Sequence, residues 1–316
     1  MPRTNLLVIL GPTASGKTNI GAHLAFYLGG EIISADSRQV YRRMDLGTGK
    51  DYADYVVNGK KIPYHLVDIH EPGYKYNVFE FQKDFIDVFN EIHQKGSFPI
   101  MVGGTGLYIQ AVLEKYKLIH VPVNLRLREE LEQKSRDELV NQLKSYRSGL
   151  HNTSDLLHKK RTIRAIEIAE YYRDHPGQEI AFPEIHPIIF GISQDREARR
   201  QKITERLHKR LVEGLVEEVS ELLKSISPED LIFYGLEYKM VTLYLIKELT
   251  YSEMIKKLEI AIHQFAKRQM TWFRRMEKSG YNIHWIDGEG SLEDKLDRIH
   301  SLLCKSDKEF NDLWKR

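Results

Sequence analysis

The sequence has little cysteine and no long apolar run, and each absence excludes a class of protein. Its one cysteine, Cys304, excludes an intramolecular disulfide and a zinc site built from several cysteines. This usage is typical of a reducing compartment, so we expect a cytoplasmic protein. No stretch approaches the roughly 18 apolar residues of a membrane helix. The first apolar run begins at Leu6, which leaves no room for a signal peptide, and we expect no membrane partner.

A strong net charge is also absent. The chain has 47 Lys and Arg against 45 Asp and Glu, which gives a formal charge of +2. This balance neither requires nor excludes a nucleic-acid partner, so the local distribution of charge has to decide. A length of 316 residues and a hydrophobic fraction of 41% suit one or two globular domains.

The most informative stretch lies close to the N-terminus, where an apolar run at 6–10 is followed by GPTASGKT. This stretch fits the P-loop pattern G-x-x-x-x-G-K-[ST], which is common in proteins that bind ATP and other nucleotides. Backbone N–H groups of such a loop, and the positive end of the next helix, point at phosphate. Lys17 adds a full charge, and Thr18 can offer its hydroxyl to Mg²⁺. The predicted phosphate-binding residues are Gly11, Pro12, Thr13, Ala14, Ser15, Gly16, Lys17 and Thr18.

Alternating short apolar runs and amphipathic segments predict an α/β fold. Its centre is a P-loop NTPase-like parallel sheet flanked by helices. Strands are expected at Glu31–Ala35, Phe98–Val102 and Pro187–Ile192, and helices at Asn19–Leu28, Asn77–Lys95 and Leu107–Glu114. Long helices are expected at Asp195–Lys224 and Ser252–Lys278, with Phe265 on the apolar face of the second, and a closing helix at Leu292–Leu303.

The segment 122–185 differs from the rest because its patterns are helical only. We interpret it as an all-helical insertion into a core formed by residues 1–121 and 186–316. Ser135 and Glu138 have the spacing of a capping box, which marks the start of a helix within it.

Ligands of open parallel sheets bind beyond the carboxyl ends of the strands. Asp36 and Thr105 both follow predicted strands, so we expect them beside the P-loop. Asp36 can take a proton or hold hydrated Mg²⁺, although a carboxylate that only caps a turn is an equal alternative. Thr105 can hydrogen-bond a transferring group, or it can be the N-cap of the following helix.

Basic residues form local groups that suit phosphate. From His263 to Lys278 there are five Lys or Arg and one Glu, an excess of four, interleaved with aromatic residues. Lys160, Arg161 and Arg164 share one face of a predicted helix. Arg206 and Arg210 lie one helical turn apart, and either can reach a diphosphate. Solvated helix faces are the alternative for each of these groups.

The histidines do not form a metal-binding pattern. No H-E-x-x-H or similar spacing is present, so we expect structural roles. The residues concerned are His65, Asp68, His70, His151 and His158.

Several stretches together resemble the bacterial tRNA dimethylallyltransferase family, also called tRNA isopentenylpyrophosphate transferases. They are GPTASGKT at 11–18, ISADSRQVYRRMDLGTGK at 33–50, VGGTGLYIQAVL at 102–113, KRTIRAIEI at 160–168, ITERLHKRLVEGLVEEV at 203–219 and FAKRQMTWFRR at 265–275. They follow the family order over nearly the whole chain. The P-loop alone is common to many families, but this succession is specific.

The resemblance implies transfer of a dimethylallyl group from dimethylallyl diphosphate to N6 of the adenosine 3′ of the anticodon in tRNA. It implies that Lys17, Arg206 and Mg²⁺ near Thr18 neutralise the diphosphate, that Asp36 accepts the proton, and that Thr105 lies between the substrates. It further implies tRNA contacts, and we expect a monomer. The implied tRNA-binding residues are Asp36, Ser37, Arg38, Gln39, Thr105, Arg126, Lys160, Arg161, Thr162, Ile163, Arg164, Lys267 and Arg268.

The chain departs from the family pattern in places. Lys160 stands where Gln or Asn is common, Asp51 follows Lys50 where Pro is usual, and 232–239 lacks the usual Gly-Tyr-Arg-type element. None of these changes touches the diphosphate site. The alternatives are a P-loop small-molecule kinase with 122–185 as its lid, a non-catalytic RNA-binding protein, and a prenyltransferase that acts on free adenylate.

Overall fold

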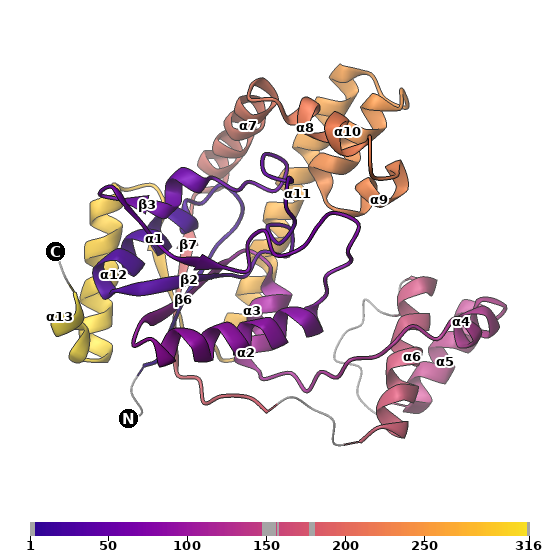
Figure 1. The fold of residues 1–316 in the computed structure, drawn as a ribbon, viewed down its shortest axis with the longest axis horizontal. Helices are drawn as coiled ribbons and strands as arrows, with labels where there is room; N and C mark the ends of the chain where they lie inside the picture. Colours follow the sequence, from indigo (N-terminus) through magenta and orange to yellow (C-terminus); the bar gives the residue numbers. More distant parts are fainter. Residues whose placement is uncertain (1–3, 147–155, 157, 177–180, 315–316) are drawn as a thin grey trace. The chain divides into compact units, whose positions relative to one another are not determined.

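A parallel sheet of six strands lies at the centre of the larger part of the molecule (Figure 1). The computed structural model describes residues 4–146, 156, 158–176 and 181–314. The strand order is β5-β2-β6-β1-β7-β8, so β1 lies between β6 and β7, and the P-loop follows β1. The strands are β1 (Leu6–Leu10), β2 (Gly30–Ser34), β5 (Tyr64–His65), β6 (Phe98–Gly103), β7 (Pro187–Ser193) and β8 (Ile283–Asp287).

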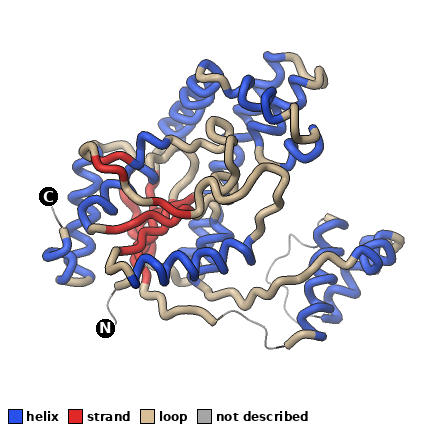
Figure 2. Tube along the Cα trace, in the orientation of Figure 1, coloured by secondary structure: helices blue, strands red, loops and turns tan. Residues whose placement is uncertain are grey.

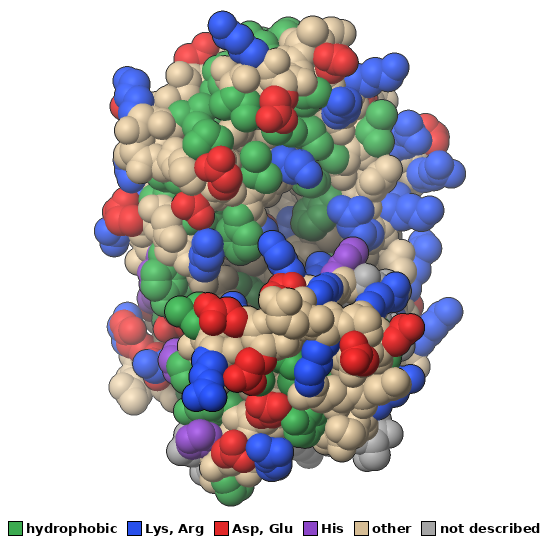
Figure 3. All heavy atoms as spheres, turned by 90° about the vertical axis from the view of Figure 1, so that its right-hand side faces the viewer, with side chains coloured by type: hydrophobic (Ala, Val, Ile, Leu, Met, Phe, Trp, Pro, Cys, Tyr) green, Lys and Arg blue, Asp and Glu red, His purple; other side chains and the backbone are tan. Residues whose placement is uncertain are grey.

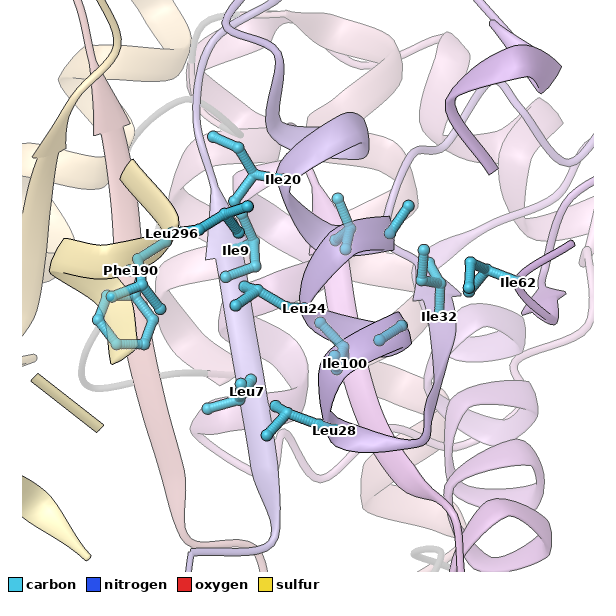
Figure 4. Packing of buried hydrophobic residues seen from close by; sticks show 14 of the residues in the cluster. Leu7, Ile9, Ile20, Leu24, Leu28, Ile32, Ile62, Ile100, Phe190 and Leu296 are labelled. Atoms are coloured by element: carbon cyan, nitrogen blue, oxygen red, sulfur yellow. The ribbon is translucent and has the colours of Figure 1, made fainter. Parts of the chain in front are cut away.

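Helices cover both faces of this sheet, which explains why β1 is apolar throughout and fully buried (Figure 2). On one face, Leu7 and Ile9 of β1 pack against Ile20 and Leu24 of α1, with Leu296 of α12 in the same cluster (Figure 4). The helices of this face are α1 (Lys17–Leu28), α12 (Leu292–Ser306) and α13 (Glu309–Leu313).

On the other face, α2 packs on β2 and β6, and α3 lies between α2 and α11. The start of α2 follows directly from the sequence, because Asn77 and Glu80 form a complete capping box. Gly96 ends this segment with a φ of +72°. The helices of this face are α2 (Val78–Gln94), α3 (Gly106–Leu113) and α11 (Tyr251–Lys278).

The chain divides into two compact units, Met1–Tyr116 with Phe182–Arg316, and Lys117–Ala181. These boundaries lie a few residues before the expected 122 and 185. Residues 119 and 121 belong to the smaller unit because the Ile119 N–H donates to Tyr172 Oη (3.0 Å) and the Val121 carbonyl accepts from Arg164 (2.9 Å). Glu184 belongs to the larger unit, since its carbonyl accepts a hydrogen bond from the side chain of Asn5 (2.8 Å).

The described part of the smaller unit is helical, with a small apolar core of its own. The Ser135–Glu138 capping box is present, because each residue's backbone N–H donates to the other's side chain. Buried Leu131, Leu139 and Ile166 belong to the core. The helices are α4 (Leu125–Glu132), α5 (Arg136–Tyr146) and α6 (Lys159–Asp174).

Some of the expected elements need correction. The long helix expected over 195–224 is two helices, because Gly214 adopts a φ of +106° between them. Strand β8 and the short helices that precede α11 were not expected, and neither was the β3–β4 hairpin. The elements concerned are α7 (Arg196–Val212), α8 (Leu215–Leu222), α9 (Pro228–Phe233), α10 (Leu236–Leu245), β3 (Val56–Val57) and β4 (Lys60–Lys61), with the 3-10 turn η1 (Tyr52–Tyr55).

Candidate active site

The P-loop forms a cradle for an anion at the start of α1. Gly16 adopts a φ of +76° and Ala14 a φ of +61°, so the loop turns sharply before the helix begins at Lys17. Among the residues that the structure describes, none caps this helix start with its side chain. The first N–H groups of α1 are therefore available to an anion, which the helix dipole also favours.

Lys17 lies in this cradle, and its Nζ is 3.4 Å from the carbonyl oxygen of Pro12. Burial lowers the pKa of Lys17 to about 8, Asp36 opposes the shift, and Arg206 and Arg210 add to it. The ammonium form of Lys17 is therefore destabilised mainly by burial and further by repulsion from the two arginines. A bound polyanion would relieve that repulsion, so the electrostatics favour a phosphate-bearing ligand.

A small cavity beside the P-loop gathers further positive charge. Arg206 of α7 donates a hydrogen bond to Thr13 Oγ1. Burial lowers the pKa of Arg206 to about 10, and the charge of Arg210 adds to the effect. Arg210 is only 5% exposed, and its Nη2 has no hydrogen-bond partner among the described residues. The cavity is lined by Thr13, Ile203, Arg206, Leu207, Arg210, Glu237 and Ile262.

A buried guanidinium nitrogen without a partner costs free energy unless a ligand supplies the missing acceptor. Arg210 and Arg206 thus place positive charge on the wall of a cavity beside Thr13 of the P-loop, an arrangement that suits an anion. The sequence pattern left open which of these arginines reaches the ligand, and the structure places both on the cavity wall.

The turn after β2 brings Asp36 and Thr105 together, as their positions after two strands predict. Asp36 Oδ1 accepts from the Arg38 N–H (2.9 Å), and Thr105 Oγ1 accepts from the Ser37 N–H (3.1 Å). Thr105 occupies the N-cap position of α3, but its side chain makes no capping hydrogen bond. The hydroxyl instead holds the 36–39 turn. Asp36 does cap its own turn through Oδ1. This hydrogen bond does not prevent the carboxylate from also taking a proton, so the two alternatives for this residue are compatible.

The loop at 44–50 is fixed by a residue that the sequence pattern did not single out. Glu218 of α8 accepts backbone hydrogen bonds from Asp45 (2.9 Å), Leu46 (2.7 Å) and Gly47 (3.0 Å). The carbonyl of Gly49 in the same loop accepts from Gln39 Nε2 (3.1 Å). The loop therefore orients Gln39 of the 36–39 turn. Glu218 lies inside the quoted 203–219 stretch, but only a fold shows which backbone it meets.

Helix α11 presents an exposed face of cations and aromatic rings. Phe265 was expected on the apolar stripe, but it is 40% exposed, because the buried stripe passes through Ile262, Ala266 and Gln269 instead. Arg268 lies over its ring, 6.0 Å from the centroid.

Further along α11, Arg275 lies over the half-buried Trp272 ring, 5.8 Å from its centroid. Figure 3 shows that Lys and Arg side chains are numerous on the surface that it draws. Rings paired with cations are the features that proteins use to hold single-stranded nucleic acid.

The basic stretch of helix α6 is only partly exposed, unlike the cations of α11. Lys160 and Arg161 are exposed, but Thr162 and Ile163 are buried, so these two pack within the unit and do not form an RNA surface. Arg164 forms an ion pair with the buried Glu167. Of the cations that the resemblance implies for tRNA contact on this helix, Lys160 and Arg161 are therefore free of this ion pair, whereas Arg164, with 38% of its side chain exposed, is held by it.

Glu167 is the centre of a buried ion network in this unit. Burial alone would raise its pKa, but hydrogen bonds from Arg128, Arg164 and the Asn124 N–H lower it. Arg126, by contrast, is exposed and pairs with Glu130 one turn along α4 (3.2 Å). Arg126, whose side chain is 91% exposed, is thus more accessible to an external phosphate than Arg164, whose side chain is 38% exposed.

His65 and His70 have structural partners, as expected, and His158 stands at the N-cap position of α6 without a side-chain capping hydrogen bond within the described part of the chain. His65 pairs with Glu31 (2.7 Å), and His70 stacks on Tyr74 with ring centroids 4.3 Å apart. Asp68 is bound to the buried Lys50. In 4–146, 156, 158–176 and 181–314 no group of three or more His, Cys, Asp or Glu is arranged to hold a metal. His151 lies outside the described residues.

The sequence patterns also did not single out Phe233, an exposed aromatic residue at the end of α9. Phe233 is 47% exposed, and the Arg38 guanidinium lies over it, 5.3 Å from the ring centroid. The neighbouring Tyr234 is buried and donates to the Tyr74 carbonyl (3.1 Å), which fixes the position of the ring. The divergent stretch 232–239 therefore contacts the turn that holds Asp36.

A comparison with protein families matches residues 39–276 to the family described as IPP transferase. A protein from Phocaeicola vulgatus named tRNA dimethylallyltransferase 2 is 57% identical over 304 residues, which are 96% of this chain and 99% of the relative. A protein from Parabacteroides distasonis named tRNA dimethylallyltransferase 1 is 58% identical over 297 residues, 94% of this chain and 96% of the relative.

Solved structures agree with these matches. The tRNA isopentenylpyrophosphate transferase of Bacillus halodurans superposes with a TM-score of 0.71 at 30% identity, over 98% of this chain and 99% of that one. A eukaryotic dimethylallyltransferase described as acting on tRNA gives a TM-score of 0.75 at 20% identity, over 98% and 80% of the chains, and supports the fold alone.

Proposed function

The chain belongs to the IPP transferase family, and we propose that the P-loop, the adjoining cavity and the 36–39 turn form its active site. The enzyme transfers a dimethylallyl group from dimethylallyl diphosphate to N6 of the adenosine 3′ of the anticodon in tRNA. In this reaction the allylic C–O bond breaks, a C–N bond forms, N6 loses a proton and diphosphate leaves.

The leaving diphosphate is held by the P-loop and the cavity beside it. N–H groups at the start of α1 donate hydrogen bonds to its oxygens, and Lys17, Arg206 and Arg210 supply positive charge. Negative charge on the leaving group grows as the allylic bond breaks. Cations fixed in advance therefore stabilise the transition state more than the ground state.

Mg²⁺ is a proposed cofactor, and the available side chains suit it. Thr18 offers a hydroxyl, and the carboxylates of Asp36 and Asp54 both lie close enough to Lys17 to raise its pKa. Oxygen donors of this kind, completed by water and substrate phosphate, are those that Mg²⁺ prefers. When bound, Mg²⁺ would supply further charge neutralisation to the diphosphate.

Asp36 is the proposed general base, and Thr105 positions the groups around it. The carboxylate lies at the carboxyl end of β2 beside the P-loop, where N6 would approach the allylic carbon. An aromatic amine is a poor nucleophile, so its placement and the removal of its proton both lower the barrier. Ser37, Arg38 and Gln39 would read the edge of the adenine.

The target base has to leave its stack to reach this site. We propose that the anticodon arm is held by Lys267 and Arg268 of α11, by Lys160 and Arg161 of α6, and by Arg126. Arg38 with the Phe233 ring offers a further surface for a nucleotide in the loop.

The compartment and the assembly are further proposals. No helix in the described part of the chain is long and apolar enough to cross a membrane. A single cysteine suits a reducing compartment, so we propose that the enzyme acts in the cytoplasm, where its tRNA substrate is found, and as a monomer.

The observation that carries the site assignment is the meeting of Lys17, Arg206, Arg210 and Asp36 around one uncapped helix start. The test is transfer of labelled dimethylallyl to an anticodon stem-loop with an adenine run, in the presence of Mg²⁺. We expect Asp36→Ala to lower the transfer rate by about 10²-fold or more, the scale of a positioned base.

Asp51→Asn is the matched control, because it removes one exposed carboxylate from the nearby loop. We expect this variant to retain the rate within about threefold, as for a surface charge. Undiminished transfer by Asp36→Ala would remove Asp36 as the base. Turnover of ATP on a small acceptor, without transfer to any RNA, would overturn the reaction and favour a kinase.

A further inference from the structure

Helix α11 buries one polar side chain on its otherwise apolar inner face. Gln269 is 7% exposed, and the neighbouring buried residues of the helix include Ala266, Met270 and Phe273. A buried amide costs free energy unless its oxygen and its nitrogen are both hydrogen-bonded. The partners of Gln269 therefore indicate why a glutamine stands at a core position.

Both ends of the amide are used, and each meets a different part of the active site. Gln269 Oε1 accepts from the Thr13 N–H of the P-loop (2.9 Å). Gln269 Nε2 donates to the Gly104 carbonyl (2.9 Å), directly before Thr105. A Cβ on Gly104 would lie 2.4 Å from this nitrogen, so a larger residue there would displace the Gln269 amide.

The same face of α11 also holds the other flank of Thr105. Trp272 packs on Gly106, where an added Cβ would lie 2.4 Å from its Cδ1. Thr13 in turn accepts the hydrogen bond of Arg206 through its hydroxyl. A single helix face therefore sets the positions of Thr13, Thr105 and, through Thr13, the Arg206 guanidinium.

The outer face of this helix carries Lys267 and Arg268, which the proposed function assigns to RNA. We propose that Gln269 is a positioning residue that links RNA binding on α11 to the alignment of the diphosphate cradle with Thr105. This inference rests on the proposed function. The physical reason is that reacting groups must be aligned to within about 1 Å, and a misplacement of that size costs about 10²-fold in rate.

The test compares Gln269→Glu and Gln269→Met with the same changes at Gln264, an exposed residue of the same helix. Glu keeps an acceptor for the Thr13 N–H but sets a carboxylate oxygen against the Gly104 carbonyl, and Met removes both hydrogen bonds. We expect the single-turnover rate at saturating substrates to fall about 10- to 10²-fold in both variants, as for misaligned reactants. We expect the Kd for the stem-loop to change less than about threefold.

A second readout separates positioning from simple loss of stability. In the unaltered enzyme we expect the stem-loop to tighten binding of inorganic diphosphate, and in the Gln269 variants we expect this coupling to vanish. A purely structural role would lower Tm and leave the coupling of the folded fraction intact. Transfer at the wild-type rate with intact coupling in either Gln269 variant would overturn the inference.

A measurement on the unaltered chain covers the case in which the variants do not fold. Hydrogen exchange at the Thr13 amide should be slow and should slow further when the stem-loop binds, because α11 then holds Gln269 in place. If the exchange rate of the Thr13 amide is the same with and without the stem-loop, the proposed coupling is wrong. Failure of the unaltered enzyme to modify any RNA would instead overturn the proposed function, so the two failures are distinguishable.

Discussion

The cations at the P-loop and the cations on the outer face of α11 are the same residue types in opposite environments. Lys17 and Arg206 are crowded by burial and by other positive charges, and their pKa values fall to about 8 and about 10. Lys267 and Arg268 are exposed, and Arg268 lies over an aromatic ring. The positive charges of the first group are destabilised while no anion is bound, whereas those of the second group are stabilised by water.

This difference shows what each group can do for the reaction. Desolvated charges act strongly on a ligand that replaces their water, because the effective dielectric constant is low. Exposed charges act weakly and are screened by salt. The buried group is therefore suited to stabilising a transition state, and the exposed group to holding a long polyanion.

Among substitutions that would test this comparison, we expect the largest loss of activity at the cations beside the P-loop. Arg206→Gln should lower kcat/KM for dimethylallyl diphosphate by about 10²- to 10³-fold, the scale for losing one preorganised donor. Steady-state kinetics with the stem-loop at saturation measure it. Lys209→Gln, an exposed position on the same helix, is the control and should change little. Equal effects of the two substitutions would contradict the distinction.

An intermediate effect is expected from the titration of Lys17. Its pKa of about 8 in the folded protein lies below the value near 10.4 of an unfolded chain. Between roughly pH 8 and pH 10 the unfolded chain therefore binds a proton that the folded chain lacks. Through this group, the free energy of unfolding of the ligand-free protein should rise with pH across that range.

Urea unfolding of the wild type and of Lys17→Met at pH 7.5 to 9.5 measures this slope. The difference between the two proteins should grow with pH in favour of the wild type. Lys267→Met, which removes an exposed lysine, should keep the wild-type slope. Parallel curves for the wild type and Lys17→Met would show that Lys17 is not crowded in the folded protein.

The smallest effect is expected on the exposed face of α11. Arg268→Gln should raise KM for the stem-loop about two- to fivefold and leave KM for dimethylallyl diphosphate unchanged, because one phosphate contact is lost. The slope of log K against log salt should fall by about 1. Binding measured over a salt series checks both values, and an unchanged slope would remove Arg268 from the RNA surface.

Local sequence patterns were sufficient for the elements that depend on neighbouring residues. The start of α2 follows from Asn77 and Glu80, and the P-loop follows from its glycines and Lys17. The spacing of strand ends also predicts that Asp36 and Thr105 meet, because parallel strands end at one edge of the sheet. The break at Gly214 was missed, since the apolar stripe continues through it and glycine alone does not end a helix.

Residues whose roles depend on distant partners could not be predicted in this way. Glu218 is typical of a helix surface until the loop at 45–47 meets it, and Phe265 fits an apolar stripe until the fold exposes it. Arg164 fits a basic helix face, but only the fold shows that it pairs with the buried Glu167. In each case, the deciding contact joins segments that no local pattern relates.

The sequence by itself determined the α/β class, the anion cradle and the family, because these depend on short motifs whose chemistry is local. Only the tertiary structure decided which cations are buried beside that cradle and which remain in water. It also decided that Gln269 joins Thr13 to Gly104, 256 and 165 residues away from it along the chain. The physical reason is that desolvation and long-range hydrogen bonds exist only after distant segments have packed together.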